Sequence, residues 1–119
     1  MDVLKTLQTQ LATFASERDW DQFHTPKNLA MALSGEVGEL VERFQWLTSE
    51  QSERDALSDE DIRAIEEEMA DVLLYLLRLA DRLRVDMAAA SRNKLRLNAE
   101  KYPIAEAKGN AVKYSRRDK

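Results

Sequence analysis

Apolar residues recur at steps of three and four along most of the chain, which is the period of amphipathic helices. The spacing predicts a first helix over residues 3–18. Thr25 followed by Pro26 is typical of a helix start, because threonine caps the N-terminus and proline at the first helical position loses no hydrogen bond. Apolar residues at helical spacing extend this second predicted helix to about Leu47.

The most apolar of the predicted helices follows a polar segment, residues 48–58, which is typical of a loop. Ser58 with Asp61 three positions later resembles a capping box, and acidic residues there suit the positive end of a helix dipole. The apolar spacing then continues to Leu83. Leu74 lies off the main stripe, so this helix is apolar on more than one side, as expected if it lines a pocket or meets another subunit.

A fourth helix is predicted from the cap residue Asp86 to about Lys101, where a Tyr-Pro pair stops it. The chain has 119 residues with three glycines and two prolines, which favours a few long helices around one core over a β-sandwich or barrel. We therefore expect an all-α fold, in which a single four-helix bundle-like domain covers residues 1–103 and a basic tail covers residues 104–119.

The composition excludes several classes of protein. The chain contains no cysteine, which rules out disulfides, thiolate metal sites and a thiol nucleophile and fits a reducing compartment. The net charge of -4 gives no overall attraction to duplex nucleic acid. The longest apolar run, residues 72–77, is far shorter than the roughly 20 residues that span a bilayer, and no basic leader precedes an apolar stretch. We expect a cytoplasmic protein without a membrane or duplex nucleic acid as partner.

Two pairs of acidic residues stand out. Glu36 and Glu39 are three positions apart in the second predicted helix, and Glu68 and Asp71 are three apart in the third. Residues at this spacing share a helical face, so two antiparallel helices can bring four carboxylates to one point. Glu36 falls within the margin of the apolar arc and Glu39 at its edge, so Glu36 is not an ordinary solvent-facing residue.

Four carboxylates at a partly buried site repel one another and lose hydration, and a divalent cation is the simplest compensation. Oxygen ligands suit Mg²⁺, with Mn²⁺ as a possible substitute, and Mg²⁺ also takes phosphate oxygens of a substrate. The pattern thus indicates phosphate-ester or phosphoanhydride chemistry on a nucleotide. The alternative is that the acidic residues lie on solvated helix faces. The position of Asp71 favours this alternative, because Asp71 lies far from the centre of the apolar arc of its helix. A di-iron site is excluded, because it needs two Glu-x-x-His pairs and the chain has one histidine.

Aromatic residues and that histidine gather in the connection after the first helix. Trp20 and His24 lie in this loop, and Trp46 lies off the main arc of the second helix. Near a polyphosphate site, aromatic faces can stack on a base. The alternatives are that the tryptophans are core residues and that His24 makes an ordinary polar contact.

A polar stripe runs along the fourth predicted helix. Lys94, Asn98 and Tyr102 follow one another at four-residue steps, so they share one face. Such a stripe can meet phosphate or sugar, and an exposed helix face explains it equally well.

These segments together resemble a family. Residues 34–40 (Ser-Gly-Glu-Val-Gly-Glu-Leu) and 67–73 (Glu-Glu-Met-Ala-Asp-Val-Leu) are similar to the E-x-x-E…E-x-x-D signature of the all-α nucleoside triphosphate pyrophosphatases, the MazG-like superfamily. The flanking segments resemble its dCTP pyrophosphatase branch: residues 18–26, Phe-Gln-Trp at 44–46, Lys94, Asn98, Tyr102-Pro103 and Lys113-Tyr114. The resemblance covers roughly residues 3–115, and the loop at 48–57 carries no motif.

The resemblance implies a house-cleaning enzyme that hydrolyses a (deoxy)nucleoside triphosphate, such as dCTP, to the monophosphate and pyrophosphate. It implies that Mg²⁺ is held by the two acidic pairs and that the chain forms a homotetramer, a dimer of dimers with shared sites. The base would be held by aromatic residues, and further positions would lie near the phosphates and sugar. The residues implied are, for metal and catalysis, Glu36, Glu39, Glu68 and Asp71, and for substrate, Trp20, His24, Trp46, Tyr75, Lys94, Asn98 and Tyr102.

Two other functions stay open at this point. A relative acting on phosphoribosyl-ATP shares the acidic helices, but the Trp20 loop and Trp46 disfavour it. A non-catalytic helical oligomer that binds nucleotides or a protein partner would keep the aromatic loop and would not need both acidic pairs.

Overall fold

The computed structural model describes residues 2–112, and every regular element in that range is helical. The expectation of an all-α chain is confirmed for these residues. Contacts divide the chain into two units, Met1–Val85 and Asp86–Lys119. No helix within the described range is long and apolar enough to cross a membrane. The helices of the first unit are α1 (Val3–Glu17), α2 (Pro26–Glu42) and α3 (Asp59–Leu83), with short 3-10 turns at Asp21–Phe23, Glu50–Ser52 and Arg54–Ala56.

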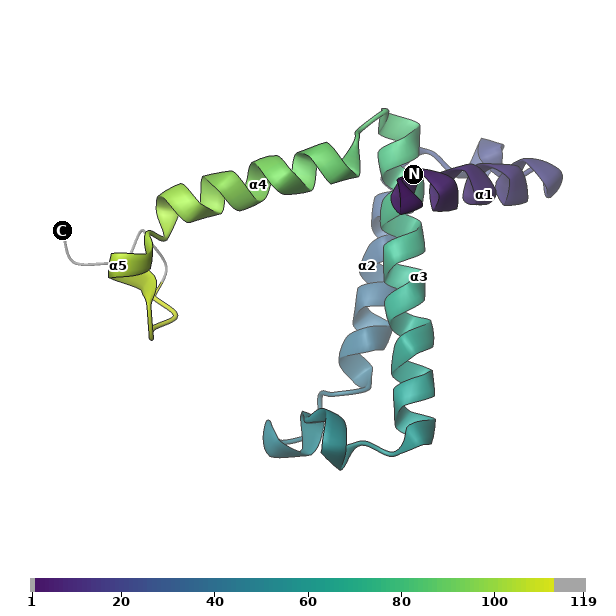
Figure 1. Cartoon of the computed structure of the whole chain (residues 1–119). Helices are drawn as coiled ribbons and strands as arrows, with labels where there is room; N and C mark the ends of the chain where they lie inside the picture. The colour runs from purple at the N-terminus through teal and green to yellow at the C-terminus, as the bar shows by residue number, and fades with distance from the viewer. Residues whose placement is uncertain (1, 113–119) are drawn as a thin grey trace. The chain divides into compact units, whose positions relative to one another are not determined.

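The first unit is built on α2 and α3, which run antiparallel along each other, with α1 packed against α3 (Figure 1). Its core holds one leucine from each long helix, Leu29 of α2 and Leu77 of α3, both almost fully buried. Ala15 of α1 is buried as well. Gln8 fixes α1 on α3, because its side-chain amide donates to the Leu77 carbonyl oxygen at 3.0 Å. The antiparallel α2/α3 pair is the scaffold on which the acidic residues lie.

The predicted helix starts are confirmed. The Thr25 hydroxyl accepts from the backbone N–H of Asn28, with Pro26 at the first helical position. Ser58 and Asp61 form a reciprocal capping box at the start of α3. Each cap satisfies backbone donors that a helix end leaves unpaired. These local bonds fix where α2 and α3 begin, and thereby set their register.

The end of the second helix differs from the prediction. We expected the helix to continue to Leu47, whereas α2 ends at Glu42, residues 43–46 form turns and Leu47 lies in a bend. Phe44 and Leu47 keep the helical spacing, but the N–H of Leu47 bonds three residues back, to Phe44, at 2.9 Å. Apolar spacing does not distinguish such a turn from a helix. As a result Trp46 lies in a turn.

The second unit contains α4 (Met87–Lys101) and the short α5 (Ile104–Ala107). The Asp86 carboxylate caps α4 as predicted, accepting from the N–H of Ala89. Three of the four expected helices belong to the first unit and α4 to the second. No residue of α4 is buried, because this helix has few large apolar side chains. The single domain over 1–103 stays a prediction, and residues 113–119 of the expected basic tail lie outside the described residues.

Candidate functional site

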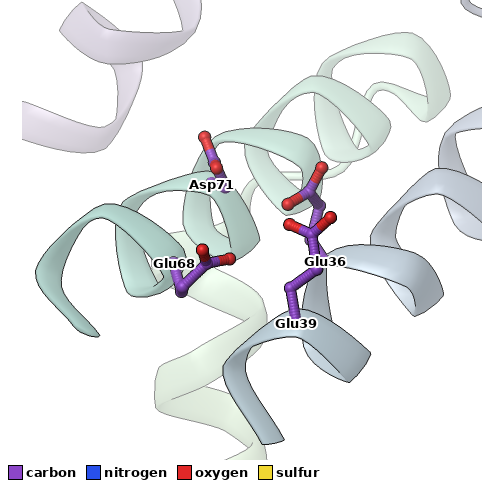
Figure 2. A group of neighbouring side chains, drawn as sticks. All are labelled: Glu36, Glu39, Glu68 and Asp71. Atoms are coloured by element: carbon purple, nitrogen blue, oxygen red, sulfur yellow. The ribbon is translucent and has the colours of Figure 1, made fainter. Parts of the chain in front are cut away.

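Four carboxylates meet between α2 and α3. Glu36 and Glu39 come from α2, and Glu68 and Asp71 from α3 (Figure 2). One carboxylate oxygen of each lies within 4.8 Å of the others. The i,i+3 spacing gives each pair one helical face, and the antiparallel packing sets the faces opposite each other. The convergence predicted from spacing is therefore present.

The cluster is partly withdrawn from water. Glu36 and Glu68 are half-buried, and the Glu68 side chain is only 15% exposed. In each of these two residues Oε2 is buried and has no hydrogen-bond partner among the described residues. Glu39 and Asp71 are exposed at the rim. A buried acceptor without a donor is costly, so these two oxygens require a donor or a cation.

The charges in the cluster disfavour its ionised form. A hydrogen bond with the Glu36 carboxyl, together with repulsion by its charge, raises the pKa of Glu39. Burial, followed by the neighbouring Glu39, raises the pKa of Glu68. The Arg43 guanidinium, 3.7 Å from Glu68 Oε1, counteracts this rise, but it supplies one positive charge against four carboxylates. The donor set and the two unpaired oxygens fit a hard divalent cation such as Mg²⁺ or Mn²⁺.

A cavity of about 470 Å³ adjoins the cluster on the side of α1. Asp71 lines it together with three further residues of the predicted site, Trp20, His24 and Tyr75. The remaining wall is mostly apolar and comes from α1, α2 and α3. A mostly apolar pocket with a few polar groups is typical of a small-molecule site.

Local geometry places Trp20 in this cavity. Asp19 adopts a left-handed conformation with φ 55, which turns the chain sharply after α1. The backbone N–H of Trp20 then donates to the Ala15 carbonyl at 2.9 Å. The indole packs edge-on against Phe14, with ring centroids 5.6 Å apart. Trp20 is thus held against α1 while it stays 42% exposed and lines the cavity.

Trp46 lies in a different cavity. Its side chain is 87% exposed and lines a space of about 550 Å³, together with Glu39, Arg43 and Glu68. The two tryptophans expected to hold a base therefore occupy separate cavities of one chain, and each cavity contains members of the acidic cluster.

Three residues of the predicted site belong to the second unit. Lys94 and Asn98 are exposed on α4, and Tyr102 is the half-buried residue that ends that helix. Lys94 and Asn98 lie four positions apart within α4, whereas Tyr102 lies just beyond its end. The part of all three residues in a site stays a prediction.

The residue that sequence reasoning missed is Arg78 of α3. It is 5% exposed and forms ion pairs with Asp21 at 2.6 Å and with Asp81 at 3.2 Å. Its Nε also donates to His24 Nδ1 at 3.1 Å. The signal in the sequence is an arginine between two leucines in the apolar second half of α3, where a charge needs partners.

Comparison with known proteins agrees with this architecture. A family model described as the MazG-like family matches residues 31–116. The chain is 46% identical to dCTP pyrophosphatase 1 of Bos taurus and 45% identical to that of Homo sapiens, in each case over 112 residues, or 94% of this chain. These matches span 66% of each relative's length. A solved structure of a pyrophosphatase from Archaeoglobus fulgidus DSM 4304 is similar in fold, with a TM-score of 0.78 and 41% identity over 87% of this chain and 94% of that chain.

Proposed function

This chain belongs to the MazG-like family, and on that premise we propose that it is a Mg²⁺-dependent nucleotide pyrophosphohydrolase. Its substrate is a deoxynucleoside triphosphate, with dCTP favoured, and its products are the monophosphate and pyrophosphate. The observation that carries the proposal is the cluster of four carboxylates with two buried, unpaired oxygens. The choice of dCTP is supported by the similarity to dCTP pyrophosphatase 1.

In this proposal Glu36, Glu39, Glu68 and Asp71 hold the cation. When bound, a divalent cation supplies positive charge that neutralises the triphosphate and activates a water for attack on the α-phosphorus. The bond from the α-phosphorus to the bridging oxygen breaks, and pyrophosphate leaves. The exposed rim residues Glu39 and Asp71 keep the cluster open to the substrate, while Glu36 and Glu68 anchor it between the helices.

The aromatic residues bind the nucleoside. Trp20, His24 and Tyr75 line a cavity that begins at Asp71, so a base or sugar there lies next to phosphates on the cation. Trp46 lines the cavity that begins at Glu39 and Glu68, and stacks on a base from that side. Lys94 and Asn98 of α4, with Tyr102 just after it, are our candidates for contacts to the phosphates and sugar.

The chain works as a homotetramer, a dimer of dimers. Large apolar side chains of the α2/α3 pair are exposed in the single chain, among them Met31, Val41 and Met69, each more than half exposed. Exposed apolar surface of this kind is typical of subunit interfaces. A second subunit brings further residues to sites that one chain leaves open. A cytoplasmic location stays a prediction.

The test is a product analysis with purified protein. Each common nucleoside triphosphate, and separately phosphoribosyl-ATP, is incubated with Mg²⁺, and the products are separated and identified. Monophosphate and pyrophosphate from dCTP, lost in Glu36→Gln and Glu68→Gln, support the proposal. Glu67→Gln is the matched control, because Glu67 is exposed on the same helix outside the cluster. Nucleotide binding without turnover indicates the non-catalytic oligomer, and turnover of phosphoribosyl-ATP alone indicates the other hydrolase.

A further inference from the structure

Arg78 connects α3 to the loop that carries His24. All three guanidinium nitrogens are used: Nε donates to His24 Nδ1 at 3.1 Å, one terminal nitrogen donates to Asp21 at 2.6 Å and the other donates to Asp81 at 3.2 Å. The group is almost fully buried. The two carboxylates pair with the terminal nitrogens, and Nε bonds to the imidazole of His24, which lines the same cavity as Arg78.

This bond determines where the imidazole carries its proton. A guanidinium only donates hydrogen bonds and stays charged at all relevant pH values. His24 Nδ1 must therefore be the unprotonated acceptor, and the proton of the neutral ring lies on Nε2. Nε2 has no hydrogen-bond partner among residues 2–112. The ring lines the 470 Å³ cavity beside Trp20, with ring centroids 6.2 Å apart.

We infer that Arg78 is a positioning residue that holds His24 in the Nε2–H form and thereby makes it a hydrogen-bond donor to the nucleotide. The inference rests on the proposed function for the identity of the ligand, but not for the protonation state. The fixed Nε2–H donates to a carbonyl oxygen or to an unprotonated ring nitrogen at the edge of the base, and it disfavours an edge that presents an N–H at that point. The cavity therefore selects bases by an acceptor atom.

The surroundings keep the ring neutral. Burial, then the Arg78 charge, lowers the pKa of His24, and Arg82 adds a smaller effect in the same direction. Asp21 opposes them. A protonated ring would also lose its acceptor for Arg78 Nε, so the bond and the charges favour the same state.

The first experiment measures the protonation state directly. His24 is the only histidine, so its two ring nitrogens give unambiguous signals in a ¹H–¹⁵N NMR spectrum of the ¹⁵N-labelled full chain. At neutral pH the wild type should show protonated Nε2 and unprotonated Nδ1. Arg78→Met should shift the ring toward a mixture of both neutral forms and the cation. Arg82→Met is the matched control, because it removes a nearby charge that makes no hydrogen bond to the ring, and its neutral ring should keep the proton on Nε2.

A wild-type spectrum with protonated Nδ1 overturns the inference without any variant. A spectrum of folded Arg78→Met identical to the wild type overturns it as well. Circular dichroism shows whether Arg78→Met folds. If this variant does not fold, the NMR spectrum of the wild type alone tests the inference. Because the spectrum requires no turnover, it remains informative if the proposed enzyme activity is not found.

The second experiment separates positioning from simple structural support. With the preferred nucleotide, Arg78→Met should raise KM about two- to tenfold, the range of one neutral hydrogen bond, with kcat changed less than about twofold. In a His24→Phe background, Arg78→Met should not raise KM any further. An equal rise in KM in both backgrounds shows that Arg78 acts only by supporting the loop, and overturns the inference.

Discussion

Trp46→Ala should weaken nucleotide recognition while leaving the subunit folded. The side chain is 87% exposed, so truncation removes only about 30 Å² of buried surface, worth under about 1 kcal/mol at ~25 cal/mol per Å². Stacking of a base on an aromatic ring is worth about 1–3 kcal/mol. The free energy lost from stacking thus exceeds the free energy lost from folding. The predicted fall in kcat/KM is about 5- to 150-fold.

The assay compares wild type, Trp46→Ala and Trp46→Phe. Steady-state kinetics give kcat/KM for dCTP, and inhibition by pyrophosphate gives the affinity for a ligand without a base. Trp46→Phe keeps an aromatic face and should retain most of the activity, and pyrophosphate affinity should barely change in either variant. Equal losses for nucleotide and pyrophosphate would refute the stacking role. So would a fall in the unfolding free energy of several kcal/mol, since it would show that Trp46 is buried in the assembly.

Three further predictions concern the metal, the assembly and pH. Mg²⁺ at a hundred times its Kd should stabilise the wild type by about 2.7 kcal/mol in thermal unfolding but leave Glu68→Gln unchanged; an equal shift in both would place the cation elsewhere. Light scattering at low micromolar concentration should give a tetramer or a dimer, and a stable monomer would contradict the shared site. The lowered pKa of His24 makes the unfolded chain bind a proton at higher pH than the folded chain, so His24 destabilises the fold as pH falls below about 6.5. Urea unfolding should show this loss in wild type relative to His24→Gln, and a constant difference between pH 8 and pH 5 would exclude it.

The sequence predicted those features of the fold that depend on residues close together in the chain. The starts of α2 and α3 follow from Thr25 and Ser58, because a cap is a bond between residues three positions apart. The end of α2 was wrong by five residues, because Phe44 and Leu47 keep the apolar spacing through a turn. The start of α4 follows in the same way from Asp86, and this helix, with few large apolar residues, buries none of them.

The site was predictable where it depends on helical periodicity. Two acidic pairs at i,i+3 on antiparallel helices converge as the spacing requires. The separation of Trp20 from Trp46 depends on the turns at Asp19 and after Glu42, which the pattern does not encode. The bond between Arg78 and His24 joins residues 54 positions apart, so only the tertiary structure reveals it.

The position of water attack tests the central claim most directly. Hydrolysis of dCTP with Mg²⁺ in ¹⁸O-enriched water, followed by mass spectrometry of both products, identifies the phosphorus that is attacked. Attack on the α-phosphorus places one ¹⁸O in dCMP and none in pyrophosphate. Label in pyrophosphate, release of orthophosphate as the first product, or intact dCTP would contradict the proposed pyrophosphohydrolase.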